Sequence, residues 1–226
     1  MFPMVTLRET DFTFSAIEDR DGIDVAVPLR FCRADDKSDT YLLKVWHRLS
    51  QAVIFHHELS GDVTKCPTWA KWKPHEWCKQ SVPDRQQFVA WHGSVLAGFL
   101  NLRKDFASQY GPSKSLVYVE HLASFPGFIS SDIWSRKLRY VGVPLLGFAV
   151  LQSMLQGCDG SVGLHVDGGA MKFYEQLPDM MGFPVFHPAK YDVSGPLPVG
   201  EHARAQAYLE MMPDAANQIL EVHRNV

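Results

Sequence analysis

The sequence predicts a mixed α/β fold, and three observations carry that prediction. Two extended runs flank His92–Gly93–Ser94, which indicates a β-hairpin over residues 86–103. A glycine-bearing turn leads into an apolar helix over residues 144–156. Between Leu116 and Phe183 the order is strand, helix, strand, helix. Because strands and helices alternate in this part of the chain, we expect helices that flank a sheet.

The length, composition and charge of the chain predict one globular domain with neither a nucleic-acid nor a membrane partner. The chain has 226 residues, 46% of them hydrophobic, so we expect a single domain over residues 1–226 with a full core. The formal net charge is −3, and nothing points to nucleic acid. No apolar run approaches the roughly 18–20 residues that span a bilayer, and the N-terminus does not resemble a secretory signal. We therefore expect neither a nucleic-acid nor a membrane partner.

The cysteines predict a reducing compartment. Cys32, Cys66, Cys78 and Cys158 are too few and too scattered for a disulfide scaffold. We expect a cytoplasmic protein with isolated thiols.

The first part of the chain predicts short strands followed by one helix. Residues 1–34 consist of short extended pieces, and Asp21–Gly22 marks a turn among them. Apolar residues at helical spacing then predict a helix over residues 38–60, with Ser38 or Asp39 as its N-cap and Gly61 after its end.

Residues 61–84 form a tryptophan-rich insertion without a clean period. Disordered segments are poor in aromatic residues, so we expect an ordered loop or short helical turns. Trp69, Trp72 and Trp77 are candidates for covering an acceptor substrate; the alternative is that their rings only pack the loop onto the core.

The remaining elements follow in order. Strands are predicted at residues 116–123 and 161–166, around the helix over residues 144–156. Proline suits the first position of that helix, and Gly157 suits the left-handed position after its end. A second helix is predicted over residues 168–177. Residues 185–226 form a C-terminal extension with one strand and a terminal helix that Pro213 interrupts.

The turn from Arg139 to Pro144 is a candidate phosphate site. It reads Arg139, Tyr140, Val141, Gly142, Val143, Pro144 and leads into a helix. Backbone N–H groups at the positive end of a helix dipole bind anions. A single glycine before a helix is also what an ordinary helix start contains, so the residues alone leave both interpretations open.

The combination of these segments resembles the GNAT N-acetyltransferase superfamily. Arg139 and Gly142 match the family's Gln/Arg-x-x-Gly-x-Gly/Ala turn, and the segments VYVEHLAS, SVGLHV and AMKFYEQL resemble the fourth strand, the fifth strand and the next helix. The hairpin resembles the second and third strands. The resemblance covers residues 85–185 well and the first 60 residues loosely. It implies a mixed, mostly antiparallel sheet whose central strands splay apart, with helices on its flanks.

The resemblance also implies a coenzyme A site. Backbone amides of the turn hold the pyrophosphate, and the strand end at Leu122, Ala123 and Ser124 holds the pantetheine arm. Three features depart from the family pattern: Pro144 lacks an amide donor, the link over residues 125–138 is long, and residues 178–181 are extra.

Glu120 is the candidate general base. On an alternating strand it shares a face with Tyr118 and Leu122. Transfer to an amine needs the ammonium deprotonated, which a carboxylate does directly or through water. Family members with a glutamate on this strand support that role, and the alternative is a surface or salt-bridged glutamate.

Tyr174 is the candidate general acid. The family's tyrosine in an Ala-x-x-Phe-Tyr pattern lies beside the thioester sulfur, and a phenol with a pKa of about 10 suits protonation of a thiolate. The alternative is a half-buried core tyrosine on an amphipathic helix.

Other titratable residues favour packing over chemistry. His121 and His165 lie on the central strands, where a proton relay and a hydrogen-bonded packing role are both open. His56–His57–Glu58 lacks the spacing of a zinc protease, and Cys66, His75 and Cys78 give too few ligands, so we expect no metal site.

The sequence thus predicts an acetyl-coenzyme A-dependent N-acetyltransferase that acts directly on a primary amine of a small molecule. The alternatives are transfer to a protein or peptide, transfer of a longer acyl chain, and a non-catalytic coenzyme A-binding module of the same fold. A homodimer is one expectation for an oligomeric state that the sequence leaves open.

Overall fold

The computed structural model describes residues 8–49, 51–52, 84–110, 115–125, 137–166, 170–188, 190–191 and 207–224. Its contacts divide into two compact units. Unit 1 comprises Met1–Phe14, Arg103–Val119 and Gly147–Val226, and unit 2 comprises Ser15–Leu102 and Glu120–Leu146. Each unit is assembled from segments that are distant in the sequence, so the prediction of a single domain over residues 1–226 stays a prediction.

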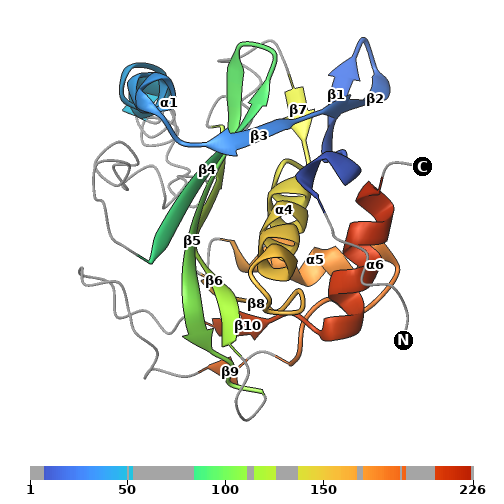
Figure 1. Ribbon diagram of the computed structural model, residues 1–226. Helices are drawn as coiled ribbons and strands as arrows, with labels where there is room; N and C mark the ends of the chain where they lie inside the picture. Colours follow the sequence, from blue (N-terminus) through green and yellow to red (C-terminus); the bar gives the residue numbers. More distant parts are fainter. Residues whose placement is uncertain are drawn as a thin grey trace. The chain divides into compact units, whose positions relative to one another are not determined.

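Unit 2 contains a small antiparallel sheet in the order β2-β1-β7. Strands β1 (Ser15–Arg20) and β2 (Ile23–Pro28) form a hairpin, which Figure 1 shows in blue. The predicted turn is confirmed, because Asp21 and Gly22 both have positive φ angles, as the tight turn of a twisted hairpin requires. On its other side β1 pairs with β7 (Lys137–Arg139), which brings Arg139 opposite Ile17. The hairpin therefore fixes the backbone just before the predicted phosphate turn.

The helix predicted after residue 38 begins earlier than expected. Helix α1 (Asp36–Tyr41) has Asp35 as its N-cap, and Asp35 and Ser38 bond to each other's backbone N–H groups. The prediction of Ser38 or Asp39 as the cap was wrong, because Ser38 occupies the third helical position and completes a capping box. The helix continues as the π-helical turn η2 (Leu42–Trp46). Residues 53–60 of the predicted helix lie outside the described residues.

The predicted β-hairpin of unit 2 is confirmed. Strands β4 (Arg85–His92) and β5 (Val95–Ala107) flank a turn at Gly93–Ser94, and β3 (Arg30–Arg33) pairs antiparallel with β4. Trp46 of η2 packs into this sheet, and its indole N–H donates to the Leu96 carbonyl at 2.9 Å. In unit 2, η2 thus packs on the sheet that contains β3, β4 and β5.

Unit 1 holds a mixed sheet. Strand β6 (Ser115–Ser124) pairs in parallel with β8 (Val162–Val166), and the register joins Val117–Val119 to Val162–Leu164. Strand β8 pairs antiparallel with β10 (Ala207–Glu210), which pairs antiparallel with β9 (Lys190–Tyr191). The parallel register covers three residue pairs, and β6 continues beyond it from Glu120 to Ser124.

The helix after the predicted phosphate turn is α4 (Gly142–Leu155). It starts two residues before Pro144, so the prediction that Pro144 occupies the first position was wrong. Val143 N–H already bonds to the Tyr140 carbonyl at 3.0 Å, which begins the first turn, and proline fits within that turn because its missing N–H has no helical acceptor there. The predicted left-handed residue after the helix is confirmed at Gly157, whose φ is +78°.

Two further helices belong to unit 1. Helix α5 (Met171–Met181) includes Pro178 and ends at the left-handed Gly182, so the extra residues 178–181 lengthen this helix by one turn. Helix α6 (Pro213–His223) lies beside α4, as Figure 1 shows; a Cβ atom at Gly147 would meet His223 Cδ2 at 2.9 Å.

The C-terminal extension differs from its prediction. The prediction of a terminal helix that Pro213 interrupts was wrong, because Ala207–Glu210 is the buried strand β10 and Pro213 begins α6. The segment Ala-Tyr-Leu-Glu is too short for its period to distinguish a strand from a helix, and pairing with β8 decides the outcome.

These elements confirm the predicted fold class, a mixed and mostly antiparallel α/β fold with flanking helices. Among the described residues no helix is long and apolar enough to cross a membrane.

Candidate functional site

The turn at the start of α4 keeps backbone N–H groups available. Tyr140 has a φ of +60°, a left-handed conformation that is an outlier for an aromatic residue. Within the described part of the chain, the N–H groups of Val141 and Gly142 have no hydrogen-bond acceptor, whereas Val143 N–H bonds to the Tyr140 carbonyl. Strained backbone of this kind persists where the surroundings impose it and is concentrated at ligand sites. The turn therefore offers two neighbouring donors at the positive end of a helix.

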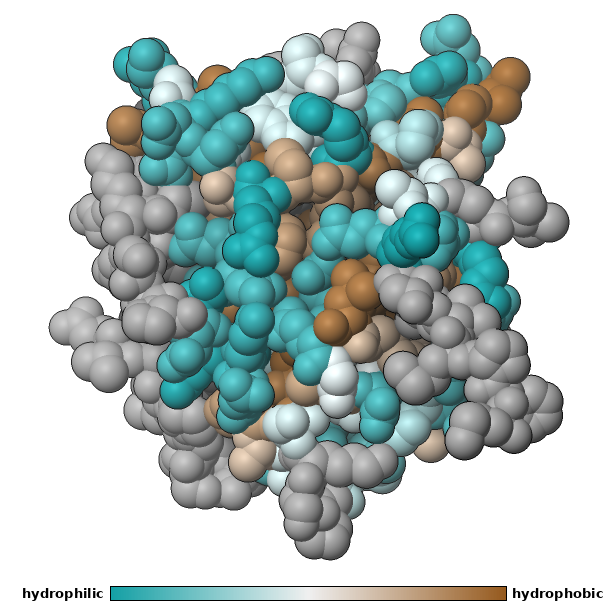
Figure 2. Space-filling model, viewed as in Figure 1, coloured by the Kyte–Doolittle hydropathy of each residue, from teal (hydrophilic) through white to brown (hydrophobic). Residues whose placement is uncertain are grey.

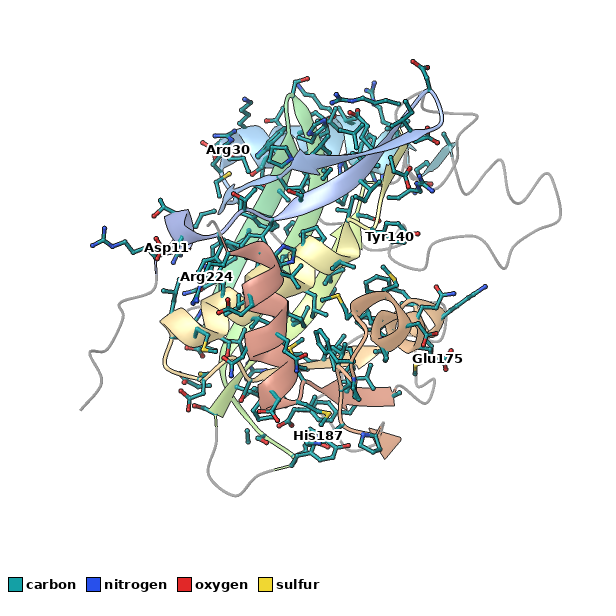
Figure 3. The ribbon with its side chains drawn as sticks, turned by 90° about the vertical axis from the view of Figure 1, so that its right-hand side faces the viewer. Asp11, Arg30, Tyr140, Glu175, His187 and Arg224 are labelled. Atoms are coloured by element: carbon teal, nitrogen blue, oxygen red, sulfur yellow. The ribbon has the colours of Figure 1, made fainter. Side chains whose placement is uncertain are left out.

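The two side chains just before these donors are exposed, whereas Val141 itself is buried. The Arg139 guanidinium forms an ion pair with Asp24 of β2, and the Tyr140 ring is 49% exposed. Both members of the ion pair are about half exposed, so the pair contributes only about 0–1 kcal/mol. The guanidinium can therefore turn from Asp24 to a phosphate at little cost. Figure 3 labels Tyr140 at the end of β7, where the chain enters α4.

The first turn of α4 approaches the sheet of unit 2 closely at Gly98. A Cβ atom added at Gly98 of β5 would lie 2.9 Å from both terminal carbons of Leu145. A larger residue at position 98 would therefore require the Leu145 side chain to move. Glycine in the strand allows this side chain of α4 to pack directly on the backbone of β5.

Two neighbouring side chains bind one oxygen of the Glu120 carboxylate. Arg85 Nε lies 2.7 Å from its Oε2, and Asn101 Nδ2 donates to the same oxygen at 3.1 Å. The side chain of Glu120 is 11% exposed. Its Oε1 has no hydrogen-bond partner among the described residues. The structure therefore shows the salt-bridged glutamate that was the alternative to a general base, with one oxygen left outside the ion pair. The sequence missed Arg85 and Asn101, because both lie on other strands and nothing in their spacing links them to residue 120.

His121 points to the other face of β6 and is buried. Burial lowers its pKa well below the usual 6.5, and the positive charge of Arg85 lowers it further. The ring is therefore neutral near neutral pH, which favours the packing role over a charged relay.

We expect His121 to make the protein less stable in mild acid. The unfolded chain binds a proton at this histidine near pH 6.5, but the folded chain binds it only at lower pH. The contribution of His121 to the free energy of unfolding is fully present above pH 6.5 and is lost as the pH falls below that value. Urea unfolding of the wild type and His121→Asn at pH 7.5 and 5.5 measures the effect. An equal loss of stability in both proteins would contradict it.

Tyr174 lies on α5 in unit 1 and is 8% exposed. Its ring packs edge-on against Phe173 and Phe186, with centroid distances of 4.9 Å and 5.8 Å. Its hydroxyl has no hydrogen bond to another described residue. Burial raises the pKa of this phenol far above its usual value. The phenol is a weaker acid than the sequence suggested, and donating a hydrogen bond to developing negative charge suits it better than releasing its proton.

A partly buried hydrogen-bond pair in unit 1 includes His165. The Tyr118 hydroxyl lies 2.8 Å from His165 Nδ1, and the His165 ring lies 5.1 Å from that of Tyr208. These contacts join β6, β8 and β10, so the packing alternative for His165 accounts for its position.

The remaining predicted site residues have different outcomes. Leu122, Ala123 and Ser124 lie in β6, beyond the residues in parallel register with β8. Trp69, Trp72 and Trp77 lie outside the described residues, as do His56, His57, Glu58, Cys66, His75 and Cys78. In the described part of the chain no group of three or more His, Cys, Asp or Glu side chains is arranged to hold a metal.

Comparison with known proteins supports the fold. No family model and no curated protein matches the sequence. An uncharacterized protein from Bacillus halodurans is similar in structure with a TM-score of 0.52 and 13% identity, over 86% of this chain and 89% of that chain. At this identity the likeness concerns the fold alone.

Acetyltransferases recur among the similar solved structures. The PaiA N-acetyltransferase from Thermoplasma acidophilum, in complex with coenzyme A, has a TM-score of 0.44 and 14% identity over 80% of this chain and 97% of that one. An aminoglycoside N-acetyltransferase in complex with CoA has a TM-score of 0.44 and 15% identity, over 73% of this chain and 93% of that one.

Proposed function

We propose that the protein transfers an acetyl group from acetyl-coenzyme A directly to a primary amine of a small molecule. The observation that carries the proposal is the left-handed turn at Tyr140, which presents the N–H groups of Val141 and Gly142 at the start of α4. Two adjacent amides at a helix N-terminus are suited to a pyrophosphate. The sequence resemblance over residues 85–185 supports the same donor.

The residues present fit the pyrophosphate in part. Val141 and Gly142 supply amides, and Arg139 supplies a positive charge that is held only by a surface ion pair. Pro144 supplies no donor. The backbone of Leu122 to Ser124 continues β6 beyond the parallel register and is the candidate for holding the pantetheine arm.

The proposed reaction forms one bond and breaks one. The amine nitrogen bonds to the thioester carbonyl carbon, the carbon–sulfur bond breaks, and the products are an amide and a thiol. Glu120 takes the proton that the ammonium must lose, with Oε1 as the accepting oxygen. Tyr174 donates a hydrogen bond to the sulfur as negative charge develops on it. The attacking nitrogen loses a second proton as the amide forms, and the leaving thiolate takes up a proton to become the thiol. The net proton released, the one that Glu120 accepted first, passes to solvent.

The donor assignment is tested by placing a negative charge in the turn. Val143→Asp puts a carboxylate in the first turn of α4, where it repels a pyrophosphate but complements the helix dipole. We expect the affinity for acetyl-coenzyme A to fall at least ~10-fold, about the effect of 1.4 kcal/mol, while the free protein keeps its thermal stability. Isothermal titration and thermal unfolding measure the two quantities.

Val143→Asn is the matched control, because it has nearly the same shape without the charge. It should bind acetyl-coenzyme A almost as the wild type does. Equal binding by Val143→Asp and Val143→Asn would remove the turn from the site. Absence of any binding by the wild type at high micromolar concentration would remove the donor assignment altogether.

Turnover separates the remaining alternatives. Release of free thiol in the presence of a panel of small amines supports the proposed reaction, whereas release only with peptides supports a protein acetyltransferase. Binding of acetyl-coenzyme A without release on either panel indicates a non-catalytic coenzyme A-binding module.

A further inference from the structure

A pocket of about 230 Å³ opens in unit 1 beside Tyr174. Helix α5 forms one wall, the segment after it forms the opposite wall, and β10 contributes one side chain. Apolar groups dominate the lining, which consists of Met171, Tyr174, Glu175, Pro178, Pro184, Val185, Phe186 and Leu209. Of these residues, Tyr174 is the one that the sequence predicts to be catalytic.

The far wall of the pocket is held in place by backbone hydrogen bonds. Gly182 ends α5 in a left-handed conformation, and its N–H donates to the Pro178 carbonyl at 2.8 Å. The chain then turns back along the helix. Met212 N–H donates to the Val185 carbonyl at 3.0 Å, and His187 N–H donates to the Glu210 carbonyl at 2.9 Å. The pocket is therefore preformed, as small-molecule sites usually are.

The volume of the pocket limits the size of its ligand. A cavity of about 150 Å³ lined by apolar side chains binds benzene. The pocket beside Tyr174 is about half as large again, so one aromatic ring with a short alkyl chain fills it. A sugar or a peptide side chain with several polar groups would meet few partners in this lining.

The charged group of the pocket is a carboxylate. Glu175 is exposed at the rim, and Figure 3 shows it on the outer surface of α5. Among the described residues that line the pocket, none is a lysine, an arginine or a histidine. On the face shown in Figure 2 the described surface is mostly hydrophilic, with hydrophobic patches. An apolar pocket with a carboxylate at its mouth complements an apolar cation.

We propose that this pocket binds the acceptor, a primary amine with one aromatic ring or a short branched alkyl chain, with its ammonium group at Glu175. The assignment of this ligand as the acceptor rests on the proposed transferase function. It places the amine in the pocket that Tyr174 lines; Glu175 holds the ammonium form, and the neutral amine is the species that reacts. A neutral acyl chain would fill the apolar part equally well but would leave the Glu175 carboxylate unused.

Direct binding without acetyl-coenzyme A tests the proposal. The probe is 2-phenylethylamine, with 2-phenylethanol as a neutral ligand of the same shape, followed by NMR titration. Glu175→Gln should weaken the amine about 2- to 5-fold, the range for an exposed ion pair, and leave the alcohol unchanged. Asp179→Asn, an exposed carboxylate on the same helix that does not line the pocket, should change neither ligand.

A larger side chain in the pocket should weaken the binding of both probes. Pro184 is exposed, so Pro184→Trp adds an indole to the pocket without burying a new group in the core. We expect at least a 10-fold loss for the amine and the alcohol. Met171→Lys provides a second variant, which places a positive charge in the pocket and should weaken the amine more than the alcohol.

Three outcomes would overturn the proposal. One is wild-type protein that binds no amine up to millimolar concentration. Another is unchanged amine binding in Glu175→Gln, Pro184→Trp and Met171→Lys. The third is a Pro184→Trp variant that keeps its affinity for the amine but binds octanoyl-coenzyme A more weakly relative to acetyl-coenzyme A. That result would assign the pocket to the acyl chain. Because acetyl-coenzyme A is absent from the amine titration, failure of the pocket and failure of the transferase proposal give separate results.

Discussion

Tyr174→Phe is expected to lower kcat about 100-fold or more on an accepted amine. Removal of a single preorganised donor to developing negative charge costs about 10²–10³ in rate in well-studied enzymes. The KM for acetyl-coenzyme A should change little, because the hydrogen bond to sulfur strengthens only as charge develops. Stopped-flow or steady-state release of thiol gives both constants.

The same substitution should leave the fold intact. The Tyr174 hydroxyl has no hydrogen bond to another described residue, and its ring packs against Phe173 and Phe186, which phenylalanine also does. Tyr110→Phe is the matched control, since it removes a phenol of unit 1 that bonds to the Pro188 carbonyl instead of lining the pocket. Full kcat in Tyr174→Phe would remove the tyrosine from the proposed chemistry while leaving the fold and the donor site untouched.

Glu210→Ala is expected to destabilise the protein by about 2–4 kcal/mol, because one buried and two partly buried donors lose their acceptor, at about 1–3 kcal/mol for a buried donor. Glu210 is 4% exposed on β10. Its Oε1 accepts from Ser108 Oγ at 2.5 Å, and its Oε2 accepts from Gln109 N–H at 3.0 Å and from the Tyr208 hydroxyl at 2.9 Å. One carboxylate thus joins β10 to the end of β5.

The Tyr208 phenol, which donates to Glu210, is a second reason to expect this loss of stability. Burial, and then the charge of Glu210, raise the pKa of Tyr208 far above its usual value, so the hydroxyl stays protonated and donates. Glu210→Gln is the graded control: it keeps the shape and one acceptor oxygen, and should cost less than alanine. Urea unfolding at pH 7.5 gives the comparison. Equal unfolding free energies for the wild type and Glu210→Ala would show that water replaces the network without loss.

Local sequence signals predicted the elements that depend on neighbours in the chain. The Asp21–Gly22 turn, the hairpin at Gly93–Ser94 and the left-handed Gly157 were all predicted, because glycine and turn residues act through their own backbone angles. The helix caps were harder. Asp35 and Ser38 are both good capping residues, and only the observed hydrogen bonds show which of them precedes the helix.

The strand β10 shows where local signals fail. Residues 207–210 are buried, and their pairing with residues 163–166 of β8 makes them a strand. Four residues contain too little periodicity to distinguish a strand from a helix. The helical pattern that follows Pro213 led to the wrong prediction that the helix also includes these residues. A partner strand about 40 residues earlier in the chain supplied the missing information.

Some features of the candidate site follow from the sequence, and others depend on the tertiary structure. The sequence by itself determined the turn before α4, the strand that carries Glu120 and the helix that carries Tyr174, because each depends on a short stretch of residue types. Only the tertiary structure decided that Arg85 and Asn101 hold Glu120, that burial keeps Tyr174 protonated, and that α5 and residues 184–186 enclose a pocket. Ion pairs, burial and pockets arise between segments far apart in the chain, and the spacing of residues within one segment carries no record of them.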